Sequence, residues 1–471
     1  MRFDQIKGGG RAAAALVCVA SLALSGARAA RAGHAAGTDT TPMTAARLAY
    51  HVTTLKNGLK VVTLEDHHAP VVTLQVWYHV GSKDEPKGKF GFAHLFEHLM
   101  FKGSKNVPSE GHARYIEQIG GQYNANTFFD RTLFFESVSA NALDRVLFLE
   151  ADRMASLNVD DANFHSERHV VEEELRLDVL NAPYGHLEDE TLALAYPAGH
   201  PYAHSTIGSI SDLDSASLAD VKAFHDTYYK PDNATLVLVG DFSGPTAIGR
   251  IEHYFGGIPP RGKAFPRIPI PNAAQTAGRR GSLADPLAPL PLVTLTYRMP
   301  PADDPDIPVF GVLSSILSHG ESSRLYRSLV RDKQISTSPG ADTEGLKLGG
   351  FFSVNADVVP GKDPATVEAA LRAEIDRLRT EPVSDAELTK AKNQALTGLV
   401  FGSVSTAQVA DRLGEADLMF GTPEQANRTY SRISGVTAAD IRRVASRYLT
   451  PAKADEITIS PASGKPKEST K

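Results

Sequence analysis

The chain has 471 residues, of which 42% are hydrophobic and 22% charged, and its formal net charge is −6. A chain of this length exceeds what one hydrophobic core usually serves, so two domains are expected. The slightly acidic balance, without a dense run of Lys and Arg, argues against a nucleic-acid-binding protein.

Residues 1–29 have the character of a secretory signal peptide. A short basic start, MRFDQIKGGGR, precedes the apolar run AAAALVCVASLALSGARA. This order predicts cleavage near Ala29 or Ala32, and the run is too short for a transmembrane helix. We therefore expect an exported protein, located in the bacterial periplasm. Because Cys18 is the only cysteine, the mature chain has no thiol ligand, and any metal must be held by His, Asp or Glu.

An N-terminal domain is expected over residues 48–257. β-prone and amphipathic patterns predict three strands, at 59–66, 71–80 and 130–139, and three helices, at 141–157, 160–180 and 216–229. Adjacent strands with clustered helices indicate an α+β fold, a mainly antiparallel sheet with helices packed on one face.

The segment GFAHLFEHLM (91–100) carries His94, Glu97 and His98. On a helix these positions are i, i+3 and i+4, so the three side chains share one face. Two imidazoles one turn apart can bind one zinc ion, and the glutamate between them stands where a carboxylate could take a proton from water. The order is His-x-x-Glu-His, the inverse of the commoner zinc motif.

The same spacing also fits the polar face of an ordinary helix. The neighbouring residues Leu95, Phe96, Leu99 and Met100 are apolar and would bury such a helix. Polar side chains on a buried helix are costly without a partner or a metal, which favours the zinc interpretation.

A third ligand must come from elsewhere in the chain. In the helical stretch 163–180, Glu167 and Glu174 are seven residues apart and share a face, whereas Glu172 and Glu173 point elsewhere. Both acids are therefore candidates for the metal site.

Two other histidine pairs are rival sites. His165 and His169 have helical spacing but no base between them, which is typical of a solvated helix start. His200 and His204 are separated by Pro201 and are expected in a turn.

The two halves of the chain resemble each other. Both end with an amphipathic helix, a proline and a β-prone strand, and the same intervals of 8 and 3 residues recur in Asp220, Tyr228 and Pro231 and in Asp440, Tyr448 and Pro451. This self-similarity predicts a duplicated domain. We expect a Pro- and Gly-rich linker at 258–290, a second domain at 291–460 and a disordered tail at 461–471.

Taken together, these motifs resemble the M16 (pitrilysin/insulinase-type) zinc metallopeptidases, in particular the half-length members similar to mitochondrial processing peptidase. The resemblance covers nearly all of the mature chain and is carried by GFAHLFEHLMFKGS (91–104), GGQYNANTFFDRTLFFESV (120–138), ERHVVEEELR (167–176), HPYAHSTIGS (200–209) and SSRLYRSLVRDKQIS (322–336). It implies two homologous domains in a clam-like arrangement.

The resemblance also implies a zinc-dependent endopeptidase that acts on peptides or unfolded polypeptides, with one zinc ion per chain. The family's ligands correspond to His94, His98 and a glutamate 76 residues after His98, which is Glu174. The general base corresponds to Glu97, and Glu167 matches a further acid near the metal.

Substrate binding is implied for two regions. Asn124, Ala125 and Thr127 match a family segment whose edge strand pairs with an extended peptide. Arg331 matches a family arginine, but the tyrosine expected seven residues later is Ser338. Either another donor in this chain replaces the tyrosine, or a partner subunit of the same family supplies an Arg/Tyr pair in a heterodimer; a homodimer is the alternative.

Two further expectations concern the arginines of the second half and an alternative function. Arg324 and Arg327 are expected on an exposed helix face with basic spacing. Some members of the family bind peptides or scaffold a complex without cleaving anything, so a non-catalytic subunit is the alternative function.

Overall fold

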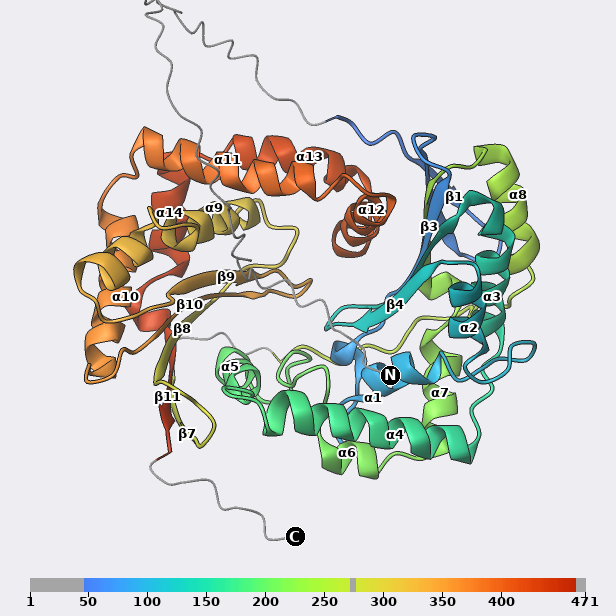
Figure 1. Ribbon diagram of the computed structural model, residues 1–471, viewed down its shortest axis with the longest axis horizontal. Coiled ribbons are helices and arrows are strands. Elements are labelled where there is room, and N and C mark those ends of the chain that lie inside the picture. The colour runs from blue at the N-terminus through green and yellow to red at the C-terminus, as the bar shows by residue number, and fades with distance from the viewer. Residues whose placement is uncertain (1–45, 272–276, 463–471) are drawn as a thin grey trace, which may run out of the picture. The chain divides into compact units, whose positions relative to one another are not determined.

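The computed structural model describes residues 46–271 and 277–462 (Figure 1). The predicted signal peptide and Cys18 lie outside these ranges, as does the predicted tail apart from Pro461 and Ala462. Within the described ranges, none of the helices combines the length and the apolar character that a bilayer crossing requires.

A six-stranded sheet forms the centre of the first half. Its strands lie in the order β1-β2-β6-β3-β5-β4. They are β1 (His51–Thr54), β2 (Lys60–Glu65), β3 (Val71–Tyr78), β4 (Gln122–Thr127), β5 (Thr132–Ser139) and β6 (Ala234–Gly240). All neighbours are antiparallel except β2 and β6, which are parallel. The predicted strands at 59–66, 71–80 and 130–139 are confirmed as β2, β3 and β5.

Alternation along β3 gives this sheet two buried faces. Leu74 and Val76 belong to the large core of the first half, whereas Trp77 points to the opposite face and a second apolar cluster. Side chains alternate along a strand, so a sequence rich in β-branched and aromatic residues can serve both clusters at once.

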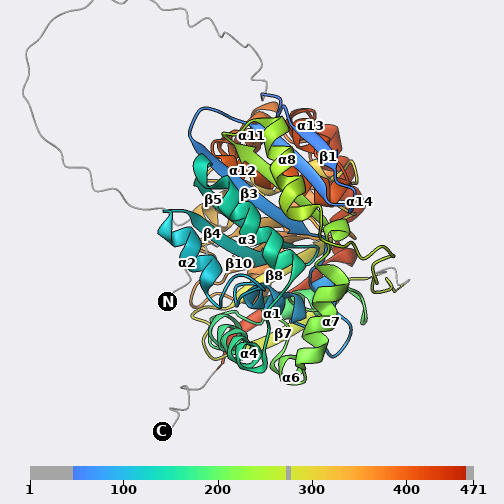
Figure 2. The same cartoon turned by 90° about the vertical axis from the view of Figure 1, so that its right-hand side faces the viewer.

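Helices of the first half cover one face of this sheet, as expected. Figures 1 and 2 show α3 and α8 over that face. The helices are α1 (Phe92–Leu99), α2 (Gly111–Gln118), α3 (Leu143–Ala155), α4 (Asp161–Leu175), α5 (Leu187–Ala195), α6 (Ile210–Asp214), α7 (Leu218–Tyr228) and α8 (Gly244–Phe255). Short 3₁₀ helices are η1 (Ser82–Asp84), η2 (Ala140–Ala142) and η4 (Pro231–Asn233), and η3 (Arg176–Leu180) is a π-helix that continues α4.

The second half is built in the same way. Its sheet has the order β7-β11-β8-β10-β9, with β7 (Arg280–Asp285), β8 (Leu292–Arg298), β9 (Gly340–Glu344), β10 (Phe351–Asp357) and β11 (Asp455–Pro461). The α-helices are α9 (Ile307–Ser318), α10 (Pro364–Thr380), α11 (Asp385–Phe401), α12 (Thr406–Phe420), α13 (Glu424–Ser434) and α14 (Ala438–Tyr448). They are joined by the π-helix η5 (Tyr326–Asp332) and the 3₁₀ helix η6 (Pro451–Lys453).

Equivalent elements confirm the duplication. The parallel pairs β2·β6 and β7·β11 occupy matching places in the two sheets, and β2 and β7 begin at residues 60 and 280. The recurring Asp220 and Asp440 have one structural role, since each completes a capping box at the start of its helix, α7 or α14. Such a box satisfies backbone donors that the first turn leaves free.

Each half also contributes one helix that packs on the sheet of the other half. α12 packs on β3 and β6 of the first sheet, and α5 packs on β8 and β11 of the second (Figure 1). These are equivalent helices, since they begin at residues 187 and 406. Each sheet is therefore covered on one face by its own half and on the other by a helix of the partner half.

Residues 280–285 of the predicted linker form the strand β7. This strand pairs in parallel with β11 and lies at the edge of the second sheet. Its residues alternate between exposed and half-buried. An edge strand needs few apolar residues, so RGSLAD did not stand out among the neighbouring Pro and Gly residues.

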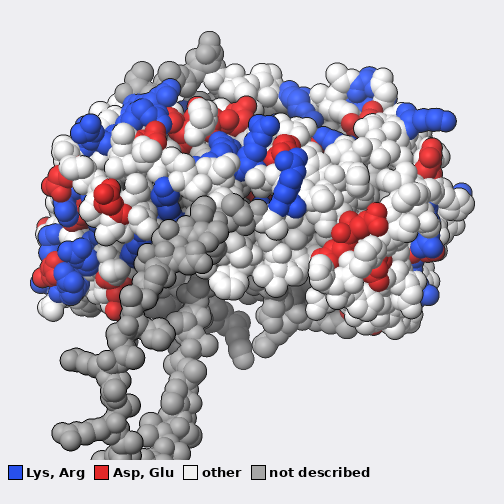
Figure 3. Space-filling model, turned by 90° about the horizontal axis from the view of Figure 1, so that it is seen from above, with Lys and Arg blue, Asp and Glu red and all other residues white. Residues whose placement is uncertain are grey.

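The side chains that carry charge are mixed over the surface. On the face seen in Figure 3, Lys and Arg lie interspersed with Asp and Glu. That face has no separate basic or acidic half.

Close packing of α12 on the first sheet leads to a test. A Cβ atom on Gly414 would lie 2.2 Å from the ring of Trp77, whereas a Cβ on Gly249 of α8 would meet no atom within 4 Å. We expect Gly414→Ala to destabilise the protein by about 1–3 kcal/mol through overpacking. Gly249→Ala is the matched control and should stabilise it by about 0.5–1 kcal/mol. Thermal unfolding measures both, and an unfolding temperature for Gly414→Ala at or above that of the control contradicts the packing.

Candidate metal centre

α1 is held so that its polar face has one orientation. Leu95 and Phe96 are buried in the core, and His94, Glu97 and His98 lie half-buried on the other side. The helix begins at Gly91, whose φ is 96° and whose Cβ, if present, would lie 2.6 Å from a backbone oxygen. Only glycine adopts this start without strain.

The polar face of α1 lies against α4. His94 Nε2 is 3.8 Å and His98 Nε2 is 3.5 Å from Oε2 of Glu174. α4 begins at Asp160, whose carboxylate accepts a hydrogen bond from the amide of Asn163. The structure thus brings together the three side chains that the sequence analysis proposed as ligands.

The three side chains fit a zinc ion. Tetrahedral zinc with bonds of about 2.0–2.1 Å holds its ligand atoms about 3.3 Å apart. The ligand atoms of His94, His98 and Glu174 all lie within 4.8 Å of one another, close to this arrangement. His94 Nδ1 and Glu97 Oε2 are buried without a hydrogen-bond partner among the described residues. A set of two imidazoles and one carboxylate suits zinc, and it leaves a position open for water.

The electrostatics of the centre follow from burial and from the neighbouring acids. Burial lowers the pKa of His94 to about 4, and His98 adds to the effect. Burial also lowers the pKa of His98, but Glu167 and Glu174 outweigh it and raise the value to about 9. Burial raises the pKa of Glu97, partly offset by His98 and Thr127. The neighbouring carboxylates therefore favour a positive charge at the ring of His98.

Glu167 lies next to Nδ1 of His98, whereas Glu174 lies next to Nε2 of the same ring. Its Oε2 is 3.6 Å from Nδ1 of His98, and its Oε1 is 2.9 Å from Nζ of Lys102. Burial raises the pKa of Glu167, but His98 and Lys102 outweigh burial and lower it. A carboxylate on the far nitrogen of a ligating histidine orients the ring and raises its basicity. The position corresponds to an orienting acid.

The remaining acids of α4 point away, as their spacing predicted. Glu172 lies 3.4 Å from both Arg168 and His169, and Glu173 pairs with Arg176 at 3.1 Å.

The edge strand β4 lies beside the metal centre. In the described part of the chain it pairs with β5 alone, so its other edge is open. Asn124 is exposed on this strand, Ala125 is buried, and Thr127 donates a hydrogen bond of 3.4 Å to the carbonyl of Ala93 in α1. The arrangement agrees with a strand that could receive a peptide, and the three residues stay predicted substrate contacts.

In the second half, the two positions that the family resemblance relates to substrate binding are both exposed. Arg331 is exposed and pairs with its neighbour Asp332 at 2.8 Å. Ser338 is exposed, and its amide donates to Asp357. The role of Arg331 in substrate binding stays a prediction. The exposed position expected for Arg324 is wrong, because its guanidinium is buried and forms two hydrogen bonds with Glu387 of α11.

The rival histidine pairs have other surroundings. His165 and His169 are exposed on α4. His200 stacks on Tyr196 with ring centroids 4.6 Å apart, and His204 stacks on Phe90 at 3.8 Å.

A second cluster of His and Glu was missed from the sequence. His112, Glu136 and Glu150 are buried together, with His112 Nε2 2.9 Å from a Glu136 oxygen. The guanidinium of the buried Arg153 lies between the two glutamates. This cation offsets the charge of one carboxylate, and burial raises the pKa of Glu150 well above its usual range, so the cluster is an internal polar network. No local spacing could reveal it, because its members come from α2, β5 and α3.

Comparison with known proteins decides the family. A family model described as insulinase (peptidase family M16) matches residues 60–207, and one described as peptidase M16 inactive domain matches residues 215–395. The zinc protease PqqE of Helicobacter pylori is 31% identical over 411 residues, which are 87% of this chain and 92% of that protein. The chain belongs to the M16 peptidase family.

Two further relatives place this M16 chain among the half-length members. A probable mitochondrial-processing peptidase subunit beta of Arabidopsis thaliana is 24% identical over 84% of this chain and 76% of its own length. The crystal structure of a protease from Helicobacter pylori superposes with a TM-score of 0.84 at 29% identity, covering 88% of this chain and 99% of that one. Both the expected family and the α+β fold class are confirmed, and the named zinc proteases indicate zinc for this family.

Removal of one ligand tests the metal centre of this M16 chain. We expect Glu174→Gln to weaken zinc binding by more than about tenfold, because loss of a ligand exceeds the effect of an outer partner. Glu173→Gln changes the neighbouring residue, which is exposed and pairs with Arg176, and should bind zinc as the wild type does. Titration against a chromogenic chelator measures both affinities; equal affinities for the two variants would remove Glu174 from the ligand set.

Proposed function

We propose that this M16 chain is an exported, zinc-dependent endopeptidase that hydrolyses peptides or unfolded polypeptides. The observation that carries the proposal is the face of α1, which directs His94 and His98 toward Glu174 and places Glu97 between the two histidines. The zinc protease relatives support it.

The chemistry divides between a metal and the side chains of α1. His94, His98 and Glu174 would hold the zinc ion, which supplies a lowered pKa for water and positive charge for a carbonyl oxygen. Glu97 lies on the same helical face, and its buried Oε2 has no hydrogen-bond partner among the described residues. In the proposal Glu97 accepts the proton of the attacking water and passes it to the leaving amine. Glu167 and Lys102 keep the ring of His98 oriented.

A peptide substrate would bind in an extended conformation. The open edge of β4 offers backbone donors and acceptors for strand addition, which recognises main chain more than side chains. Thr127 lies where this strand touches α1. A substrate paired with β4 would therefore pass the polar face of the helix.

Replacement of the base tests the mechanism. Glu97→Gln keeps the size of the side chain and should retain zinc, but we expect kcat to fall by about 10²–10⁴ because the proton acceptor is lost. Glu252→Gln, an exposed change on α8, is the control. Cleavage of quenched peptides, with and without chelator, measures activity, and full activity in Glu97→Gln sinks the mechanism. His94→Ala, by contrast, should lose the metal as well.

A second candidate function rests on the second half. A single histidine, His319, lies in residues 291–460, and the tyrosine of the family's substrate-binding pair is replaced by Ser338. The chain could therefore be a peptide-binding or scaffolding subunit with little activity alone. Under the main proposal, the same observation suggests a heterodimer in which an M16-like subunit supplies the Arg/Tyr pair, with a homodimer as the alternative.

Purification from the native host addresses export and partnership together. We expect a mature chain that begins near residue 30 and a co-purifying M16-like chain with a tyrosine seven residues after its arginine. Mass spectrometry identifies both, and peptidase assays compare the complex with the chain alone. A retained signal segment contradicts export, and full turnover by the isolated monomer or homodimer contradicts the heterodimer.

A further inference from the structure

The loop between β9 and β10 anchors the second half to the first. Leu346 of this loop is fully buried and belongs to an apolar cluster with Phe129 and Tyr202 of the first half. Gly349 accepts a hydrogen bond of 2.8 Å from the hydroxyl of Tyr196. The loop is therefore inserted among side chains of the first half.

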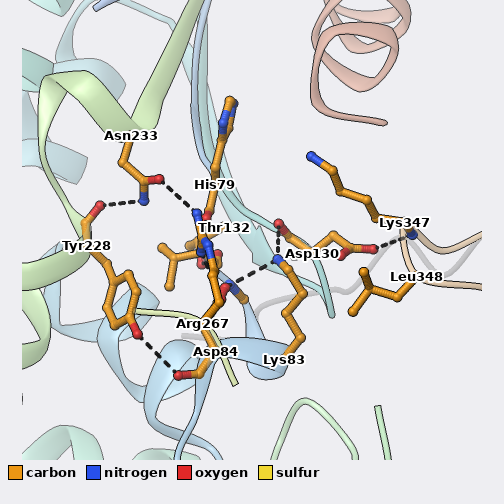
Figure 4. A network of polar contacts seen from close by, with 12 residues as sticks. His79, Lys83, Asp84, Asp130, Thr132, Tyr228, Asn233, Arg267, Lys347 and Leu348 are labelled. Atoms are coloured by element: carbon orange, nitrogen blue, oxygen red, sulfur yellow. Dashed lines mark hydrogen bonds and ion pairs between the residues drawn. The ribbon is translucent and has the colours of Figure 1, made fainter. Parts of the chain in front are cut away.

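Asp130 is the polar centre of this contact (Figure 4). Its side chain is buried, and one carboxylate oxygen accepts a hydrogen bond of 2.7 Å from the hydroxyl of Tyr202. The other oxygen accepts one of 2.9 Å from the amide of Lys347. The hydroxyl of Tyr202 also accepts the amide of Leu348, at 3.1 Å. One carboxylate and one phenol thus bind two successive amides of the second half.

Asp130 is also bound to the turn η1. Nζ of Lys83 lies 3.4 Å from Oδ1 of Asp130, donates to its carbonyl oxygen at 3.1 Å, and lies 3.2 Å from Asp84 (Figure 4). A Cβ atom on Gly81 would lie 2.1 Å from the carbonyl oxygen of Phe128. The turn and the tip of the β4–β5 hairpin are therefore in backbone contact.

The turn η1 leads directly into the anchor of the metal helix. Glu85 follows η1 and is buried. Its two carboxylate oxygens accept the amides of Gly91 at 2.8 Å and Ala93 at 2.6 Å, at the N-terminus of α1. Burial raises the pKa of Glu85 well above its usual range, although the two amides partly offset the effect. Ala93 immediately precedes His94, so the anchor lies one residue from a proposed ligand.

These contacts form one continuous path. It runs from the β9–β10 loop through Asp130 and Lys83 to Glu85 and the first turn of α1. We propose that Asp130 is a positioning residue, through which the second half fixes the orientation of the metal helix. The inference rests on the proposed zinc site. It gives the second half a structural role at that site within the same chain, although the sequence of the second half carries no metal motif.

Substitutions along this path measure the coupling at both of its ends. Asp130→Asn replaces one acceptor oxygen by a donor that faces the amide of Lys347 or the hydroxyl of Tyr202. Tyr202→Phe is a milder variant that removes a single hydroxyl. Asp306→Asn is the matched control, because Asp306 is also buried and pairs with Arg443 and Arg447 inside the second half.

Hydrogen exchange of backbone amides provides the first measurement on the full chain. In Asp130→Asn we expect exchange at Lys347 and Leu348 to rise at least tenfold and exchange across α1 (Phe92–Leu99) to rise at least threefold. Tyr202→Phe should show the same pattern with smaller changes, and the control should leave both regions unchanged.

Zinc affinity and steady-state kinetics provide the second measurement. We expect Asp130→Asn to weaken zinc binding three- to tenfold and to lower kcat with little change in KM, because the ligands and Glu97 move together. A merely structural residue would lower the unfolding temperature and move none of these quantities.

Two outcomes overturn the inference. One is unchanged exchange across α1 and unchanged zinc affinity in Asp130→Asn while Lys347 and Leu348 exchange faster. The other is equal effects in the Asp306→Asn control. A wild-type chain that binds no zinc refutes the proposed function instead, and exchange across α1 then decides by itself whether Asp130 positions that helix.

Discussion

The packing of α1 against α4 is the constraint on which the metal centre depends. Leu95 and Phe96 enter the core and so favour the rotation of α1 that turns its polar face toward α4, while Glu85 holds its first turn. Burial of two imidazoles and a carboxylate at this contact is costly unless each finds a partner. Glu174 and Glu167 supply negative charge beside His98, and the proposed zinc ion would balance it. The apolar side of one short helix thus helps to determine where the proposed chemistry would occur.

The duplicated halves have diverged in chemistry while keeping their architecture. Strand order, the parallel pair in each sheet and the capping boxes of α7 and α14 are common to both. The proposed ligands His94, His98 and Glu174 all lie in the first half. The second half is bound to it by buried polar groups and by apolar packing, which fix orientation more precisely than apolar packing alone because hydrogen bonds are directional.

Features that depend on local spacing were predictable from the sequence. The face shared by His94, Glu97 and His98 follows from helix periodicity, as does the separation of Glu174 from Glu172. The repeat of Asp220 and Asp440 was visible because a capping box is a local signal. The choice of Glu174 as third ligand came from the family resemblance, because helix periodicity places both Glu167 and Glu174 on the same face of their helix.

Features that depend on distant partners were not predictable. Arg324 is buried because Glu387, 63 residues away, meets its guanidinium. The sequence around Glu85 does not reveal that its carboxylate binds the first amides of α1. The edge strand β7 lacks the apolar alternation by which strands are usually predicted. In each case the partner comes from another element, and no spacing within one segment encodes it.

The exchange of α5 and α12 bears on how such a chain could have arisen. A single copy of the repeat would leave one face of its sheet, with residues such as Trp77 or Ile457, without a cover. Two copies that traded this helix would cover each other by the same contact made twice, as in a symmetric dimer. The present protein has the form of such a pair joined end to end, and the proposed ligands His94, His98 and Glu174 all lie in the first copy.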